Sequence, residues 1–85
     1  MIIEIKDNDG IHRSIAYVSR EVGYAVVVFA NNASTLEALC RSLRGMSVPI
    51  VYGFEVASVS IESEVLDLAG FRKINDTHTY VKNLR

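Results

Sequence analysis

The side chains that could bind a metal or act as nucleophiles are few. His12 and His78 are the two histidines of the 85-residue chain, and Cys40 is its one cysteine. Zinc sites draw their ligands from Cys, His, Asp and Glu at short, regular spacings, which these three residues do not have. The sequence therefore predicts no metal site. Cys40 stands among apolar residues at helical spacing, so we interpret it as a small buried hydrophobe rather than a reactive thiol.

Two pairs of carboxylates are close together in the sequence. Asp7 and Asp9 stand in an Asp-Asn-Asp-Gly turn, and Glu62 and Glu64 are two residues apart near the start of an expected helix. Residues two apart on a helix do not face each other, so they cannot share the proton-transfer work of paired carboxylates. We interpret both pairs as structural and predict no catalytic residue.

The segment 31–35 precedes a helix, whose first backbone N–H groups could hold an anion. Ser34 and Glu37, however, have the spacing of a capping box, in which each side chain binds the backbone N–H of the other residue. Glu37 also brings a negative charge to this helix end. The capping box is the preferred interpretation, and no cofactor is predicted.

Charge is uneven along the chain. Residues 46–70 have a net charge of −4, whereas residues 71–85 have a net charge of +3. We predict a candidate interaction surface on the basic end, made of Arg72, Lys73, Tyr80, Lys82 and Arg85. It contains one aromatic residue and no recognisable nucleic-acid motif, so a protein is preferred to a nucleic acid as its partner.

Composition limits the class of protein. Apolar residues make up 49% of the chain and the net charge is −1, which indicates one globular domain over residues 1–85 without a field that would attract nucleic acid or a membrane. A single cysteine suits a reducing compartment. Charges at Glu4 and Lys6 interrupt the N-terminal apolar residues, so we expect no signal peptide and a cytoplasmic location.

The first half predicts three strands, at residues 2–6, 11–19 and 24–30, in an antiparallel meander. The third is a continuous apolar run, which predicts burial on both of its faces. A helix at residues 35–44 follows, with Leu36, Leu39, Cys40 and Leu43 on its buried face. Gly45 is expected to end this helix in a left-handed conformation.

The second half predicts a strand at residues 50–57, parallel to the third strand because a helix connects them. Gly53 within it suggests a bulge or a close backbone approach. A second helix covers residues 60–69, or 63–69 if residues 54–61 form one long alternating strand. Ile61, Val65 and Leu68 lie on one stripe, which Leu66 and Ala69 widen. Gly70 would end it, Phe71 would fold back on it, and a hairpin of residues 71–74 and 79–84 closes the chain.

These elements predict an α+β fold. We expect a small two-layer structure with a mixed, mostly antiparallel sheet and two helices, in the order β-β-β-α-β-α-β-β. Residues 24–84 resemble, in the order and spacing of their elements, the C-terminal half of the GCN5-related N-acetyltransferase (GNAT) fold. The segment 66–73, Leu-Asp-Leu-Ala-Gly-Phe-Arg-Lys, carries the residue match to that family's helix ending in Gly-Phe.

The resemblance would imply acetyl-CoA binding, but the functional positions of the family differ here. No glycine occurs between Gly23 and Gly45, where the family has its glycine-rich pyrophosphate loop. Leu66 occupies the position of the family's tyrosine general acid. The resemblance therefore implies a degenerate relative without the cofactor chemistry.

Three functions follow as hypotheses. We expect a small non-catalytic protein-interaction or regulatory module, of a size that suits a phage or mobile-element protein, which forms a homodimer by strand addition or helix packing or binds another protein. An acyl-CoA-binding N-acetyltransferase-like protein is the alternative. A nucleic-acid-binding protein that uses the basic C-terminal hairpin is the second alternative.

Overall fold

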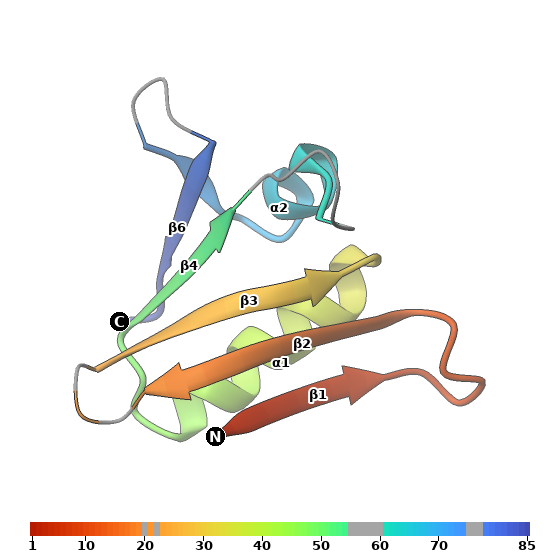
Figure 1. The fold of residues 1–85 in the computed structure, drawn as a ribbon, viewed down its shortest axis with the longest axis horizontal. Helices are drawn as coiled ribbons and strands as arrows, with labels where there is room; N and C mark the ends of the chain where they lie inside the picture. Colours follow the sequence, from red (N-terminus) through yellow and green to blue (C-terminus); the bar gives the residue numbers. More distant parts are fainter. Residues whose placement is uncertain (20, 22, 55–60, 75–77) are drawn as a thin grey trace.

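The computed structural model describes residues 1–19, 21, 23–54, 61–74 and 78–85 (Figure 1). Its elements follow the order expected from the sequence. They are β1 (Ile2–Lys6), β2 (Arg13–Ser19), β3 (Tyr24–Ala30), α1 (Ala33–Gly45), β4 (Ile50–Phe54), α2 (Ser63–Leu68), β5 (Arg72–Lys73) and β6 (Thr79–Asn83).

The strands form one six-stranded sheet in the order β1-β2-β3-β4-β6-β5. The first three strands are an antiparallel meander, β4 runs parallel to β3, and β6 pairs antiparallel with both β4 and β5. This confirms the predicted α+β class and the mixed, mostly antiparallel sheet. It also confirms that the strand after α1 runs parallel to the strand before it.

The two parallel strands stay together over a short distance. Residues 24–26 of β3 pair with residues 50–52 of β4, and the strands then diverge (Figure 1). Ala30, at the far end of β3, forms an isolated parallel bridge with Ile61 just before α2. The opening between the strands is thus bordered by the segment that leads into α2.

Both helices lie on the same face of the sheet. Figure 1 shows α1 behind β1–β3, and the packing of Leu66 of α2 on Gly53 of β4 places α2 on that face too. The core between sheet and helices includes Ala16, Val27, Leu36, Leu39 and Leu43. With an extent of 19 Å along its shortest axis, the molecule has room for two layers only.

The expectation that the third strand is buried on both faces is wrong. Tyr24 and Val28 of β3 are 38% and 45% exposed, whereas Ala25 and Val27 are buried. The apolar run masks the alternation because both faces of β3 carry apolar residues, yet only one face is covered. A β-bulge adds to this pattern, since Ile15 pairs with Phe29 and Ala16 with Val27, which leaves Val28 without an opposite residue.

Helix α1 begins earlier than predicted, and the capping box is wrong. The N-cap is Asn32, whose Oδ1 accepts a hydrogen bond of 2.9 Å from the Thr35 N–H, so Ser34 lies inside the first turn. The reason is the neighbouring Asn31, whose side chain accepts from Arg13 N–H and donates to Ile11 C=O, both at 2.8 Å. These bonds, to Arg13 at the start of β2 and to Ile11 in the turn before it, fix the chain direction just before Asn32. The predicted apolar face of the helix is confirmed as buried.

Gly45 does not end α1 in a left-handed conformation. It is the last helical residue, and Ser47 takes the left-handed position with φ of 63°. The N–H groups of Ser47 and Val48 bind the carbonyls of Arg44 and Leu43, both at 3.0 Å, which is a Schellman motif. Burial of Val48 beside the last turn sets this register, and no residue of the sequence marks it as clearly as glycine would.

Helix α2 matches the shorter of the two predicted helices, and residue 60 lies outside the described residues. Gly70 has φ of 86° and the Phe71 N–H binds the Leu66 carbonyl at 2.9 Å, so the predicted helix end is confirmed, with Phe71 buried. The predicted stripe is wrong for Leu68, which is 64% exposed. Leu66 and Ala69, which were expected to widen the stripe, are buried as predicted, and Leu66 fills the space left by Gly53.

The remaining differences concern strand ends. The second strand begins at Arg13 rather than Ile11, whose N–H binds Asp9 Oδ1 at 3.0 Å within the turn. The fourth strand is described as far as Phe54, so its predicted extension over residues 55–57 lies outside the described residues. In the closing hairpin the strands are shorter than predicted, and its turn at residues 75–77 is likewise not described.

Candidate functional site

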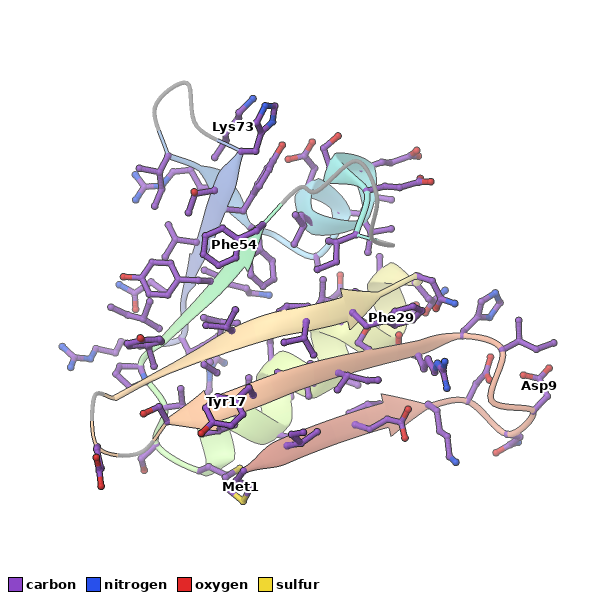
Figure 2. All side chains as sticks on the ribbon, in the orientation of Figure 1. Met1, Asp9, Tyr17, Phe29, Phe54 and Lys73 are labelled. Atoms are coloured by element: carbon purple, nitrogen blue, oxygen red, sulfur yellow. The ribbon has the colours of Figure 1, made fainter. Side chains whose placement is uncertain are left out.

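The face of the sheet opposite the helices is the most extensive candidate surface. No described element covers it, and Figure 2 shows the side chains of Tyr17, Phe29 and Phe54 on the side away from α1. The strand pattern produces this face directly, because Ser14, Ala16 and Val18 of β2 point into the core. The residues between them must then point outward. We call this surface the uncovered face.

A continuous row of side chains crosses the uncovered face from one edge to the other. Strand pairing places six residues side by side, each opposite the next. They are, from β1 to β5, Ile2, Tyr17, Val26, Tyr52, Val81 and Arg72. Five of the six are apolar or aromatic, and the row ends in a cation at the β5 edge. We call it the central row.

Large apolar side chains are unusually exposed here. Ile2 is 68% exposed and Tyr17 is 50% exposed, and Tyr24, Val28 and Phe54 are also exposed on this face. Single exposed apolar residues are ordinary on a protein surface, whereas a contiguous group of this kind marks an interaction site or a ligand groove. The grouping of these residues is therefore stronger evidence for a binding surface than any single exposed residue.

The aromatic residues form a shallow, open hollow on the uncovered face. It has a volume of about 370 Å³ and is lined by Tyr24, Val26, Tyr52, Phe54 and Thr79. The rings of Tyr24 and Tyr52 stand edge to face, with centroids 5.5 Å apart and planes at 85°. Such a pair presents an apolar body with a phenolic hydroxyl at its rim, the combination enriched where proteins meet.

Charged groups lie towards one corner of the face. Arg13 Nη1 is 3.8 Å from Glu4 Oε2, and the Arg13 guanidinium carbon lies 5.1 Å from the centre of the Phe29 ring. Both contacts are solvent-exposed and individually weak. They form a polar rim beside the apolar centre, as in many protein interfaces.

The five residues predicted from the basic end do not form one surface. Arg72, Lys73 and Arg85 are exposed, but Tyr80 is buried at 3% exposure, opposite Gly53 in the core. Lys82 is half-buried, and its Nζ donates to the Ala69 carbonyl at 2.6 Å, at the C-terminal end of α2. Tyr80 therefore offers no ring to a partner, and Lys82 serves the end of a helix.

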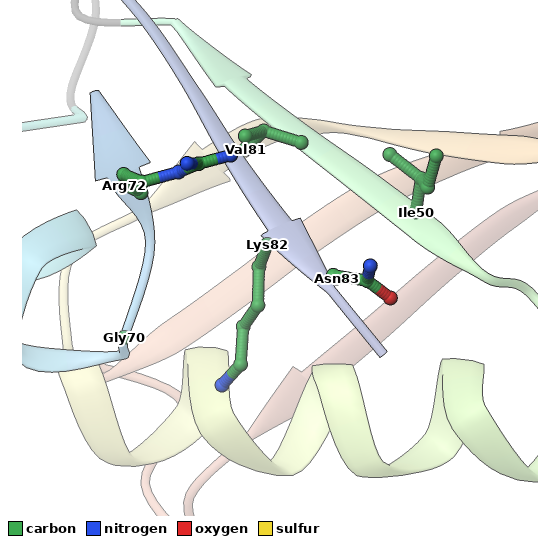
Figure 3. Close-up of a pocket in the computed structure, with 6 residues that line it drawn as sticks. All are labelled: Ile50, Gly70, Arg72, Val81, Lys82 and Asn83. Carbon is green, nitrogen blue, oxygen red and sulfur yellow. The ribbon is translucent and has the colours of Figure 1, made fainter. Parts of the chain in front are cut away.

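A hollow of about 400 Å³ lies at this basic end (Figure 3). Its lining includes Arg72, Lys82 and Asn83. Arg72 is paired with Val81 on the uncovered face, whereas Lys82 is on the helix side, and Figure 3 shows the two side chains extending in different directions. The two cations do not converge on one anion.

Another hollow, of about 260 Å³, lies where β3 and β4 have separated. It is lined by Ala30, Asn31, Glu62 and Val65, close to the start of α1. Glu62 brings a negative charge to it, which opposes an anionic ligand. Leu66, which the resemblance to the GNAT fold would place at the position of the general acid, is fully buried. An aliphatic side chain cannot donate the proton that this role requires.

The residues considered for metal or thiol chemistry are separate. His12 Nδ1 lies 3.0 Å from Asp7 Oδ2 within the exposed turn after β1. Cys40 is buried, and burial raises the pKa of its thiol, which keeps it neutral and unreactive. In the described part of the chain, no three His, Cys, Asp or Glu side chains come together as metal ligands.

Sequence reasoning missed the uncovered face because it assigned burial to both sides of the third strand. One signal was present in the sequence. In residues 14–18 the small residues Ser14 and Ala16 alternate with the larger Ile15 and Tyr17. Small residues suit a strand that lies directly under a helix, so the larger residues belong to the opposite face.

Comparison of the chain with protein-family models, with curated proteins and with solved structures finds no match in any of the three. Among the described residues, no helix is long and apolar enough to cross a membrane.

Proposed function

We propose that this chain is a small non-catalytic protein-interaction module that binds its partner through the uncovered face. The observation that carries the proposal is the central row with the exposed aromatic and aliphatic side chains around it. An apolar centre with tyrosines and a rim that contains arginine has the composition of a protein interface. The chain gains stability when such a surface is removed from water.

Several observations support a binding role over a catalytic one. The cysteine thiol is buried, and the hollow near α1 contains an acidic residue and no proton donor positioned for transfer. The charged groups of the uncovered face lie at its corner and edge, and none of them lines the aromatic hollow. A surface of this kind can exclude water from a partner, but it offers no activated group to a substrate.

The test uses affinity-tagged chain as bait in three forms: wild type, Tyr17→Glu and Leu68→Glu. Both substitutions place a carboxylate at an exposed apolar position, Tyr17 in the central row and Leu68 on α2. We expect wild type and Leu68→Glu to retain the same proteins, untagged copies of the chain included, and Tyr17→Glu to lose them. Equal retention by all three folded baits, or retention by none, contradicts the proposal.

Acyl-CoA binding is the second candidate, because the element order of residues 24–84 and the Gly70-Phe71 helix end support a GNAT-like arrangement. The opening between β3 and β4 next to the start of α1 is where the chain could hold a pyrophosphate. Calorimetric titration with acetyl-CoA tests it. Because no glycine occurs between Gly23 and Gly45 and Glu62 brings a negative charge, we expect no heat of binding. Tight binding would make acyl-CoA binding the preferred candidate.

A further inference from the structure

We propose that the occupant of the uncovered face is a second copy of this chain, packed sheet against sheet as a twofold dimer. The inference rests on the proposed function and names its partner. In such a dimer the central rows of the two copies meet in a dry core, with the sheets about 10 Å apart. The helices of both copies then form the outer layers.

The size of the face fits this partner. The two longer extents of the molecule are 34 Å and 30 Å. An ellipse with these axes outlines the whole molecule and is an upper bound for the face. Its area is about 800 Å², which reaches the area that each partner contributes to a standard-size stable interface. A short peptide would leave most of the apolar face exposed, whereas a second sheet of the same dimensions covers it.

The other surfaces of the chain are poorer for self-association. The outward side of α1 is polar, with Ser34, Arg41, Ser42 and Arg44 exposed, so packing through this helix has no apolar contact to gain. The free edge of β1 carries Glu4 and Lys6, charges of the kind that hinder strand addition. The chain has a net charge of only −1, so two copies repel each other weakly.

Charge also selects the direction of the twofold axis. An axis perpendicular to the strands would place each strand opposite the same strand of the partner subunit. It would also bring Arg72 against Arg72 of the partner subunit at the end of the central row. An axis along the strands brings β5 over β1 of the partner subunit. Arg72 then lies opposite Ile2 of the partner subunit and within side-chain reach of Glu4 of the partner subunit, an arrangement of complementary charge.

Sedimentation equilibrium of the wild-type chain and of the Tyr17→Glu and Leu68→Glu variants is the first experiment. We expect wild type and Leu68→Glu to have twice the chain mass of 9.4 kDa. Tyr17→Glu buries two unpaired carboxylates in the dimer, so its dissociation constant should rise at least ~100-fold. Circular dichroism confirms that each variant is folded.

A charge exchange tests the axis. Arg72→Glu should weaken the dimer by about fivefold to tenfold, and adding Glu4→Arg to it should restore most of the loss. A wild-type chain that stays monomeric from micromolar to millimolar concentration overturns the inference, as does a dimer that Tyr17→Glu leaves intact. If the tagged wild-type bait then captured a different protein and the Tyr17→Glu bait did not, the proposed function would still be supported. Without such capture, both the dimer and the proposed function would be contradicted.

Discussion

Gly53→Ala tests how closely α2 approaches the sheet. A Cβ atom added at Gly53 would lie 2.7 Å from Leu66 Cδ2, well inside van der Waals contact. Leu66 is fully buried, so its side chain has to shift within the core to accommodate the new methyl group. Overpacking of this kind costs about 1–3 kcal/mol, and we expect the free energy of unfolding in urea to fall by that amount.

Two comparisons make the Gly53→Ala result specific. Gly45→Ala, at a helical site with nothing within 4 Å of the added carbon, should raise stability by about 0.5–1 kcal/mol. Leu66→Ala alone should cost about 2–5 kcal/mol, and it should cost less in the Gly53→Ala background because it removes the clash. Unchanged or increased stability of Gly53→Ala, or strict additivity of the double variant, would refute the packing described for α2.

Three further substitutions test the two ends of α1, and one labelling experiment tests the burial of Cys40. Ser47→Gly should raise the free energy of unfolding by about 1 kcal/mol, because glycine adopts the left-handed conformation without strain; a loss of stability would contradict the assigned helix end. Asn32→Ala should cost about 1 kcal/mol and Ser34→Ala less than about 0.5 kcal/mol in the same urea titration, and the reverse order would restore the capping box. Because burial raises the pKa of the Cys40 thiol, labelling with Ellman's reagent near neutral pH should be slow and should accelerate as urea unfolds the chain; labelling of the native protein at the rate of a free cysteine would show that the thiol is exposed.

Elements determined by local signals were predicted well. The strands at residues 2–6 and 24–30 have the predicted bounds, and the second helix ends as predicted, with Gly70 in a left-handed conformation and Phe71 folded back and buried. Turn residues and glycine act on their immediate neighbours, so a short sequence window contains the information. The buried face of α1 follows from its spacing for the same reason.

Features that depend on distant residues were predicted less well. Asn32 and Ser34 are both good N-cap residues, and the bonds from Asn31 to Ile11 and Arg13 decide between them. Exposure of the third strand depends on whether helices cover one side of the sheet or both. The apolar sequence of the strand does not specify this. The prediction of a basic surface did not consider that side chains alternate between the two faces along β6, which directs Tyr80 into the core.

The most direct test of the uncovered face as the binding surface is a concentration series of ¹⁵N-labelled wild-type chain, followed by amide chemical shifts. We predict that the shifts that change with concentration belong to the central row and its neighbours on β1, β2, β3, β4 and β6. Amides on the outward side of α1 should stay constant. Changes confined to the helices, or to the free edge of β1, would contradict the account by placing the contact surface elsewhere.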